Sequence, residues 1–502
     1  MADNQIKKMT LNKNLAFNFS STMVSLLIMF IVTPILINNL GAEEYGVYVI
    51  LGTVIGLLGV MEFGLGEATI YYVAMYHKKN DSESINRVFS AAFWVYFLIG
   101  LILLALMLVG SEFILKVLKI DTVKPQEGLW LLRYSLISFM LIFFTSSFIS
   151  IPQALMRFDV FSYLQIGQNL LRLLVNIVAI MLGTGLAGLL LSNIIVALLY
   201  TLFTIIMAYK LLPVLKLQWP TKEGVREVFS YGIFTFLRGL VGMAWRYGDI
   251  VLIGFLLGPL YVAFFSIPHQ IMMKLLGLLS SAGKVLFSKF SSVESDEVRK
   301  KLFLDSTYLL LNLSIIIFVT LSVIFNDFLR LWVSVDFARE TYLVAIIIAS
   351  SSILRGGFIS YQAVLQGLGK PKYIFYIALV SSATVLIGDI VLIPMFGLRG
   401  AAYALLFAPI WGIIALYLTM SKILKIDKPE RLMCLFLVPC LVGLLDMILL
   451  FFLRNSYFAD TGWIGFLFFS FLCVTILSAS MLITSKFTGK FDLIMNFRRV
   501  KY

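Results

Sequence analysis

The chain has 502 residues, of which 60% are hydrophobic and only 13% are charged, and its formal net charge is +13. Soluble domains contain about 25% charged residues, so this composition excludes an ordinary globular enzyme. The mean hydropathy of +0.97 indicates a membrane protein. The three cysteines, Cys434, Cys440 and Cys473, lie in apolar segments without metal-ligand spacing, which favours packed thiols over a disulfide framework.

Apolar segments long enough to cross a bilayer as helices recur along the whole chain. The connections between them are short, and the one around residues 111–129 has room for a short surface helix. We therefore predict an all-α polytopic membrane protein. We expect about fourteen transmembrane helices. Their approximate positions are 14–38, 45–76, 89–110, 130–152, 162–183, 186–209, 229–257, 260–287, 303–325, 341–366, 373–394, 400–420, 432–453 and 463–484.

Successive connections alternate between few and many lysine and arginine residues. With both termini in the cytoplasm, about 27 of the 40 Lys and Arg residues fall on the cytoplasmic side and about 8 on the outer side. The positive charge is therefore a topology signal that matches anionic lipid headgroups, and we expect no nucleic-acid partner.

The two halves of the chain resemble each other. The segment QALMRFDVFSYLQIG from Gln153 resembles QGLGKPKYIFYIALV from Gln366, and LGAEEYGVYV from Leu40 resembles LGPLYVAFFS from Leu257, at offsets of about 213–217 residues. Two six-helix bundles with the same orientation, as in an alternating-access transporter, would explain this repeat. The predicted parts are a first bundle at 1–213, a second at 214–425, and two additional helices with a cytoplasmic tail at 426–502.

The span at 229–257 combines apolar length with charge, because it contains Arg238, Arg246 and Asp249. At about 100° per residue, Arg238 and Asp249 lie roughly 20° apart around a helix, and Arg246 lies roughly 80° from Arg238. A charged arginine near mid-bilayer costs about 2.5–3.5 kcal/mol or more. This stripe is therefore expected to face other helices or a water-filled cavity. An Arg246–Asp249 pair within the helix is the alternative.

Other spans carry polar stripes, of which the span at 162–183 is the clearest, with polar residues at helical spacing. Amides both donate and accept hydrogen bonds, which suits sugar hydroxyls, and arginine binds phosphate through two parallel bonds. Polar stripes also serve as helix–helix contacts, and that alternative stays open. The candidate substrate-binding residues are Arg172, Arg238, Arg246, Lys274, Arg355, Asn169, Asn176 and Asn18.

Two aspartates within spans, Asp249 and Asp389, are the candidate ion-coupling residues, because a desolvated carboxylate responds to protons and to nearby charge. The alternative is that both only neutralise arginine neighbours. No metal site is predicted. The segment GLLSSAGKV from Gly277 lacks the spacing of a phosphate loop, so no cofactor is expected and ATP is not expected to act on this chain directly.

Several motifs resemble one family when they are taken in order. They are NLAFNFSSTMVSLLIMFIVTPILINNLGAEEYGVYVI near the N-terminus, MEFGLGEATIYY, YGDIVLIGFLLGPLYVAFFS, LQGLGKPKY and MFGLRGAAYALL, which together cover most of residues 10–420. This order is similar to the O-antigen and capsule type polysaccharide flippases of the multidrug/oligosaccharidyl-lipid/polysaccharide exporter superfamily. The chain departs from that pattern at Tyr71 and Tyr72, where many relatives carry a basic residue.

The resemblance implies a substrate, an oligosaccharide on undecaprenyl diphosphate, that is flipped from the cytoplasmic to the outer leaflet of a bacterial inner membrane. The candidate cations would then line a cavity between the two bundles and hold the diphosphate. Expected partners are this substrate and membrane lipids, with other polysaccharide-assembly proteins left open. Which sugar repeat is carried is also open.

Two other functions compete with the flippase. A cation-coupled multidrug antiporter of the same superfamily should have twelve spans and an acidic, aromatic cavity. A membrane glycan polymerase or ligase should have a large outer loop, which the connections of this chain are too short to form. We therefore expect a transporter and not an enzyme.

Overall fold

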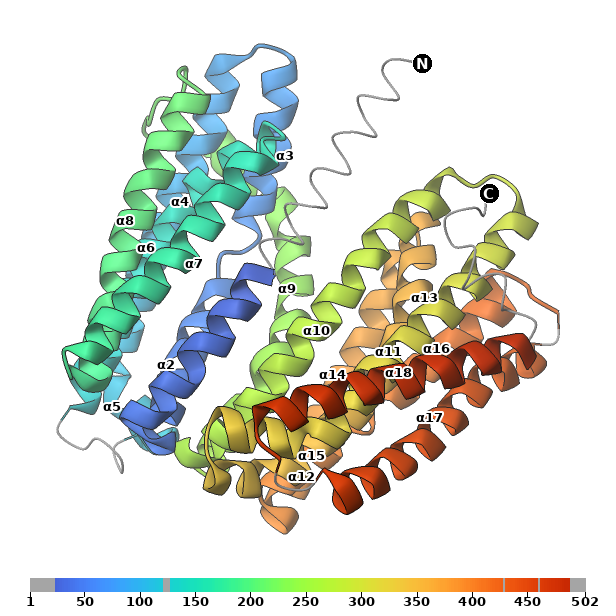
Figure 1. Cartoon of the computed structure of the whole chain (residues 1–502). Helices are drawn as coiled ribbons and strands as arrows, with labels where there is room; N and C mark the ends of the chain where they lie inside the picture. The colour runs from blue at the N-terminus through green and yellow to red at the C-terminus, as the bar shows by residue number, and fades with distance from the viewer. Residues whose placement is uncertain (1–22, 121–126, 428, 459–460, 488–502) are drawn as a thin grey trace. The chain divides into compact units, whose positions relative to one another are not determined.

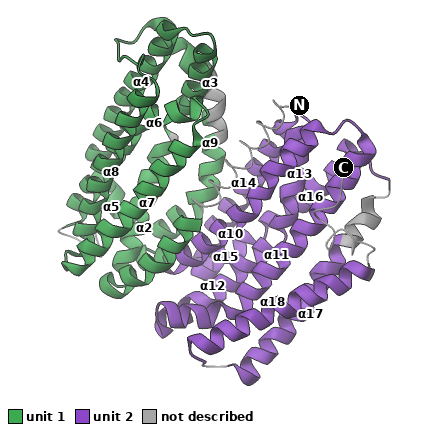
Figure 2. Cartoon of the chain, turned by 45° about the horizontal axis from the view of Figure 1, so that its top comes forward, with its two compact units in different colours: residues 1–263 green, residues 264–502 purple. Residues whose placement is uncertain are grey.

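A computed structural model describes residues 23–120, 127–427, 429–458 and 461–487 of the chain. Fourteen helices in these ranges are long and apolar enough to cross a membrane, which confirms the all-α polytopic fold and the number of spans. The chain divides into two compact units, unit 1 at residues 1–263 and unit 2 at residues 264–502 (Figure 2).

Unit 1 contains a first span at Met23–Leu40 and the helices labelled α2 to α9 in Figure 1. Their bounds are α2 Ala42–Val60, α3 Leu65–Lys78, α4 Ser82–Val109, α5 Ser111–Val117, α6 Gly128–Ala154, α7 Phe158–Met181, α8 Gly185–Leu211 and α9 Lys222–Leu256. Helix α6 packs against α3, α4 and α8, while α9 packs against α2, α3 and α4. The short α5 is the surface helix that the sequence predicts after the third span.

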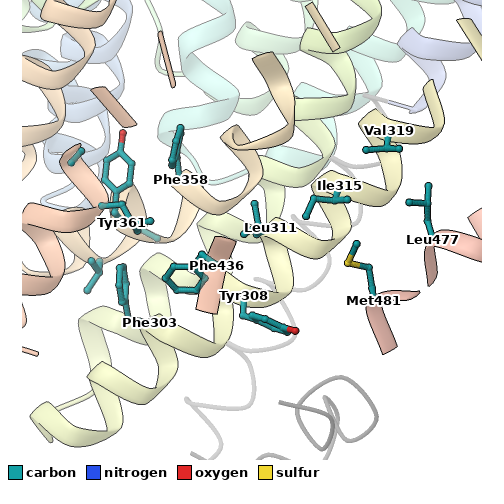
Figure 3. Packing of buried hydrophobic residues seen from close by; sticks show 14 of the residues in the cluster. Phe303, Tyr308, Leu311, Ile315, Val319, Phe358, Tyr361, Phe436, Leu477 and Met481 are labelled. Atoms are coloured by element: carbon teal, nitrogen blue, oxygen red, sulfur yellow. The ribbon is translucent and has the colours of Figure 1, made fainter. Parts of the chain in front are cut away.

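Helix α10 leaves unit 1 at Ala263 and continues into unit 2. The helices here are α10 Pro259–Ser292, α11 Asp296–Trp332, α12 Val335–Ile353, α13 Arg355–Gly367, α14 Pro371–Phe396, α15 Leu398–Leu405, α16 Ala408–Leu418, a π-helix at Thr419–Ile423, α17 Pro429–Tyr457 and α18 Trp463–Phe487. The core of unit 2 follows α11, where apolar residues at helical spacing, Tyr308, Leu311 and Ile315, lie beside Met481 of α18 (Figure 3).

The two additional helices belong to the core of unit 2. Helix α17 packs against α11 and α18. The guanidinium of Arg454 on α17 donates to both carboxylate oxygens of Asp327 on α11, at 2.6 and 2.9 Å, and Asp327 is only 5% exposed. Such a two-point, charge-assisted contact fixes the relative height of two helices. Of the three cysteines, Cys440 and Cys473 are free thiols, and the side chain of Cys434 lies outside the described residues.

Turns at equivalent positions in the two halves of the chain have similar backbone conformations. Met156 and Gly369 both adopt left-handed conformations, with φ of 56° and 68°. Each donates its N–H to the carbonyl three residues back, at Gln153 and Gln366, over 3.0 Å. Gly41 and Gly258 likewise share positive φ values of 82° and 101°. The turns thus follow the repeat, while the predicted bundle boundaries at 213 and 425 stay predictions.

Within the described residues three spans are interrupted, and none of the interruptions was predicted. The span expected at 45–76 is two helices, because α2 ends at Val60 and α3 begins at Leu65. The tenth span breaks at Leu354, between α12 and α13, and the twelfth breaks between α15 and α16. The first break has no counterpart in α10, and the break at Leu354 has none in α6. The interruptions are therefore where the two copies of the repeat differ.

Candidate functional site

Glu62 lies at the break between α2 and α3. The two residues after it, Phe63 and Gly64, adopt left-handed conformations with φ of 51° and 66°. A non-glycine residue in this conformation costs roughly 1–2 kcal/mol, so the surrounding structure must hold Phe63 in place. Its ring stacks on Phe236 of α9, with 4.4 Å between centroids. Strained backbone that packing maintains is typical of functional positions.

A phenol faces the Glu62 carboxylate. Tyr96 of α4, which is 1% exposed, donates its hydroxyl to Glu62 Oε2 over 3.1 Å. A Cβ at Gly66 would lie 3.2 Å from Tyr96 Oη, so the glycine leaves room for this pair. Ser150 of α6 donates to the Gly66 carbonyl over 3.5 Å. The carboxylate is thus held at one defined position where three helices meet.

The polar stripe of α7 lies on the better buried side of that helix. Asn176 is 3% exposed and Arg172 is half-buried, whereas Leu174 between them is 61% exposed. Within the described chain, Asn176 Oδ1 and Arg172 Nε are both buried and have no hydrogen-bond partner. Asn169, one turn before Arg172, is half-buried. The stripe therefore offers an acceptor and a cationic donor one turn apart.

In the second half of α9, the two charged residues Arg246 and Asp249 differ in burial. Asp249 is 4% exposed, while Arg246, one turn earlier, is exposed. Between them, Tyr247 packs on α2, where a Cβ at Gly56 would lie 2.5 Å from the phenol ring. The side chain of Arg238 and the whole of Asn18 lie outside the described residues, so their predicted roles stay predictions.

In unit 2, basic residues lie on α10 and at the start of α13, directly after the break that follows α12. Arg355 is the first residue of α13, and its positive charge acts on the imidazole of His269 on α10. His269 is 6% exposed and stacks on Phe265, with 5.4 Å between centroids. Lys274, on the same helix as His269, is half-buried. This group of basic residues suits an anion.

Asp389 is fully buried on α14. It shares one face of the helix with Ser382 and Val385, which are 4% and 2% exposed. In the described chain, Ser382 Oγ is buried and has no hydrogen-bond partner. Asp389 belongs to unit 2 and Asp249 to unit 1.

Sequence analysis did not single out Glu62, which lies within the motif MEFGLGEATIYY. Two glycines close to it, Gly64 and Gly66, were the available signal, because glycine within a span often marks an irregular backbone or a close approach. His269 was not singled out either. It stacks on Phe265, and Arg355, whose charge acts on it, is 86 residues away in sequence and could not be inferred.

A protein-family model described as "Polysaccharide biosynthesis protein" matches residues 35–329, more than half of the chain. The chain belongs to this family. The part that matches the polysaccharide biosynthesis family contains the α2–α3 break, the α7 stripe and α9, whereas Arg355 and Asp389 lie beyond it.

Individual relatives agree with the family. A Shigella flexneri protein named "Putative O-antigen transporter" is 21% identical over 403 residues, covering 78% of this chain and 94% of that protein. The lipid II flippase MurJ, in an inward closed conformation, has a TM-score of 0.73 at 17% identity and covers 93% of this chain and 98% of its own. An inward-facing multidrug resistance MATE family transporter of the MOP superfamily has a TM-score of 0.66 at 16% identity, covering 81% and 96%. This member of the polysaccharide biosynthesis family therefore has the fold of MurJ and MATE transporters.

Proposed function

We propose that the chain is a flippase that moves an oligosaccharide linked to undecaprenyl diphosphate from the cytoplasmic to the outer leaflet of a bacterial inner membrane, for polysaccharide export. Membership of the polysaccharide biosynthesis family and the fold shared with MurJ support this function. The mechanism we propose is alternating access, in which a cationic cavity holds the diphosphate and first sugars while the lipid tail stays in the bilayer.

The observation that carries the proposal is the pair of unsatisfied polar atoms on α7. A buried polar atom without a hydrogen bond costs about 1–3 kcal/mol, so a ligand that supplies the missing bonds to these two atoms would bind more tightly. Arg172 Nε is a charged donor suited to phosphate, and Asn176 Oδ1 is an acceptor suited to a sugar hydroxyl. One helix face thus supplies both chemistries of a sugar diphosphate.

The cationic residues are assigned to the diphosphate in this proposal. Arg172, Arg238 and Arg246 come from unit 1, and Lys274 and Arg355 come from unit 2. Arginine is favoured over lysine for the phosphates because its planar group forms two parallel hydrogen bonds. Asn18, Asn169 and Asn176 are assigned to the sugars.

The test uses Arg238, whose charge lies in the apolar part of α9. Arg238→Ala and Arg238→Glu should abolish export, while Arg238→Lys should keep part of it, because the charge survives and the two-point geometry is lost. The measurement is surface glycan in a strain without its own flippase, with protein abundance determined in the same membranes. Full export by Arg238→Glu at normal abundance would disprove the cationic site. Loss of protein in all three variants would favour a structural ion pair.

A cation-coupled multidrug antiporter is the second candidate, because MATE transporters share the fold. For either function we assign ion coupling to Asp249 and Asp389, which are 4% and 0% exposed, and we add Glu62. Glycan flipping in vesicles should then fall when both the proton and the sodium gradients are collapsed. Unchanged flipping would remove the coupling, and transport of cationic drugs without any glycan flipping would favour the antiporter.

The proposed orientation places both termini in the cytoplasm. Loops around Lys79, Lys216, Lys300 and Lys425 should be cytoplasmic, and those around Glu43, Lys119, Asp336 and Asn455 external. Single cysteines in these loops, in a chain without its three native cysteines, can be labelled from outside with an impermeant reagent. Labelling of the Lys216 and Glu43 loops from the same side would overturn this orientation.

A further inference from the structure

The connection between α8 and α9 runs as an extended segment along α4. Three α4 side chains one turn apart, Asn86, Ser90 and Trp94, bind its backbone. Asn86 donates to the Val214 carbonyl over 3.0 Å and accepts the Lys216 N–H over 2.8 Å. Ser90 bonds the Lys216 carbonyl at 3.3 Å and the Gln218 N–H at 2.9 Å, and Trp94 Nε1 bonds the Gln218 carbonyl at 2.9 Å. The segment at residues 213–220 is named the strap below.

This hydrogen bonding would allow the strap to lie at the membrane surface. Asn86 and Ser90 are 5% and 1% exposed, so the α4 side chains that bind the backbone of this connecting segment are buried. In water such a backbone would need no partners, whereas near lipid every N–H and carbonyl must be satisfied within the protein. One edge of the strap meets that requirement at three alternate residues, Val214, Lys216 and Gln218.

The length of α4 places the strap at the edge of the hydrocarbon. The helix has 28 residues, about 42 Å, and a bilayer core is about 30 Å thick, so about eight residues extend beyond it. The polar end of the helix is SESINRVF, which contains Asn86 and Arg87. Ser90 and Trp94 then lie at the boundary, the depth at which tryptophan gathers in membrane proteins.

The outer face of the strap combines apolar and cationic side chains. Trp219 is 79% exposed and stacks on Trp94, with 4.9 Å between centroids and planes within 8°. Val214 and Leu217 are 41% and 42% exposed. The exposed charges between residues 210 and 226 are four cations and one acid, namely Lys210, Lys216, Lys222, Arg226 and Glu223.

We propose that the strap is an interfacial binding surface for anionic phospholipid headgroups, with Trp219 and Leu217 in the acyl boundary and Lys216 and Lys222 against the phosphates. The apolar residues insert into the acyl boundary, and the cations attract the anionic headgroups. Each lysine near an anionic surface contributes about 1 kcal/mol to binding, which is roughly a fivefold change in the binding constant. The strap leads directly into α9, whose first turns are held on α4 by the Arg87–Glu227 ion pair at 3.3 Å. Bound lipid would therefore fix the start of α9, whatever substrate the protein moves.

The test places a fluorophore on the strap of the full-length protein. Leu217→Cys, with the three native cysteines replaced by alanine, is labelled with a polarity-sensitive dye and reconstituted in phosphatidylcholine vesicles containing nitroxide-labelled phosphatidylglycerol or phosphatidylcholine. The nitroxide should quench the dye. We expect the labelled phosphatidylglycerol to quench at least about fivefold more efficiently at equal mole fraction, the contribution of a single lysine, and the ratio to fall towards one in Lys216→Gln/Lys222→Gln or in 1 M salt.

A matched control lies at the other end of the same helix. Val109, the last residue of α4, is 89% exposed, so a dye at Val109→Cys should be quenched equally by both lipids. Equal quenching by both lipids at position 217 would disprove the headgroup preference. A dye at position 217 that no lipid quenches, while position 109 is quenched, would show that the strap is an aqueous loop and overturn the proposal.

Discussion

The break before α3 in unit 1 and the break before α13 in unit 2 differ in both backbone and charge. In unit 1, Phe63 and Gly64 turn left-handed, and the break presents the carboxylate of Glu62 to Tyr96. In unit 2, Leu354 keeps a right-handed conformation, with φ −75° and ψ −22°, and the residue that follows the break is Arg355, whose positive charge acts on His269. The residue at the interruption is therefore an acid, Glu62, in one copy of the repeat and a base, Arg355, in the other.

This difference is the basis of a proposed division of roles between the two copies of the repeat. Paired turns keep the same backbone geometry, as Met156 and Gly369 do, so the shared scaffold is set by these turns. An interruption frees backbone groups that need new partners, and within a membrane such segments are tolerated only where they are enclosed by protein or line a water-filled cavity. The proposed division assigns cation or proton coupling to the acidic break and phosphate binding to the basic one.

The largest effect should come from removing the acid. Glu62→Gln keeps the size of the side chain and its bond from Tyr96 but removes the charge, so export of surface glycan should fall to background at normal protein abundance. Glu62→Asp should retain part of the activity. Glu67→Gln is the matched control, since Glu67 is exposed five residues further on. Normal export by Glu62→Gln would show that the acidic break has no transport role.

The basic break should respond to geometry as well as charge. Arg355→Ala should reduce export about tenfold to a hundredfold, the range for losing a hydrogen bond to a charged group of about 1.5–3 kcal/mol. Export by Arg355→Lys should lie between that of the unchanged protein and that of Arg355→Ala, because lysine keeps the charge but cannot form the two-point contact. Arg339→Ala on α12 is the control, as an exposed arginine of the same span. Equal export by the Ala and Lys variants would mean that Arg355 does not hold the diphosphate.

The fold was largely predictable because membrane spans are a local property of apolar length. The short α5 and the register of the repeat from Gln153 to Gln366 were likewise readable from local patterns. The break at Glu62 was not, because the run MEFGLGEA is as compatible with a helix as with a turn. Its left-handed Phe63 is held by Phe236 on α9, a contact across 173 residues that no local pattern contains.

The candidate site was predictable only where one helix contains it. The α7 stripe follows from spacing, and the structure places Arg172 and Asn176 on the better buried side as expected. The pairs Tyr96–Glu62 and Arg355–His269 join different helices, so they depend on packing that the sequence does not display.

The break in unit 2 should be sensitive to volume. Gly356 follows Arg355, and a Cβ there would lie 2.4 Å from Ser314 Cβ and 2.7 Å from the Leu310 carbonyl of α11. Because the carbonyl belongs to a helix backbone, it cannot move aside alone. Gly356→Ala should therefore lower the free energy of unfolding by about 1–3 kcal/mol, the usual cost of overpacking. Thermal unfolding in detergent measures this, and an unchanged midpoint would mean that α13 can shift away from α11.

The break in unit 1 should instead be sensitive to backbone conformation. Gly64 has φ +66°, which an L-residue with a side chain disfavours, so Gly64→Ala should cost about 1–2 kcal/mol. Gly64→Asn should cost less than Gly64→Ala although asparagine is larger, because its side chain tolerates the left-handed region.

Gly52→Ala on α2 is the matched control, since Gly52 is an exposed helix residue with nothing within 4 Å of its added Cβ. There the same change should stabilise by about 0.5–1 kcal/mol. Thermal unfolding of the three variants should therefore rank Gly52→Ala highest and Gly64→Ala lowest. If Gly64→Asn is the least stable, side-chain volume rather than backbone conformation limits this break, and the contrast between the two units loses its physical basis.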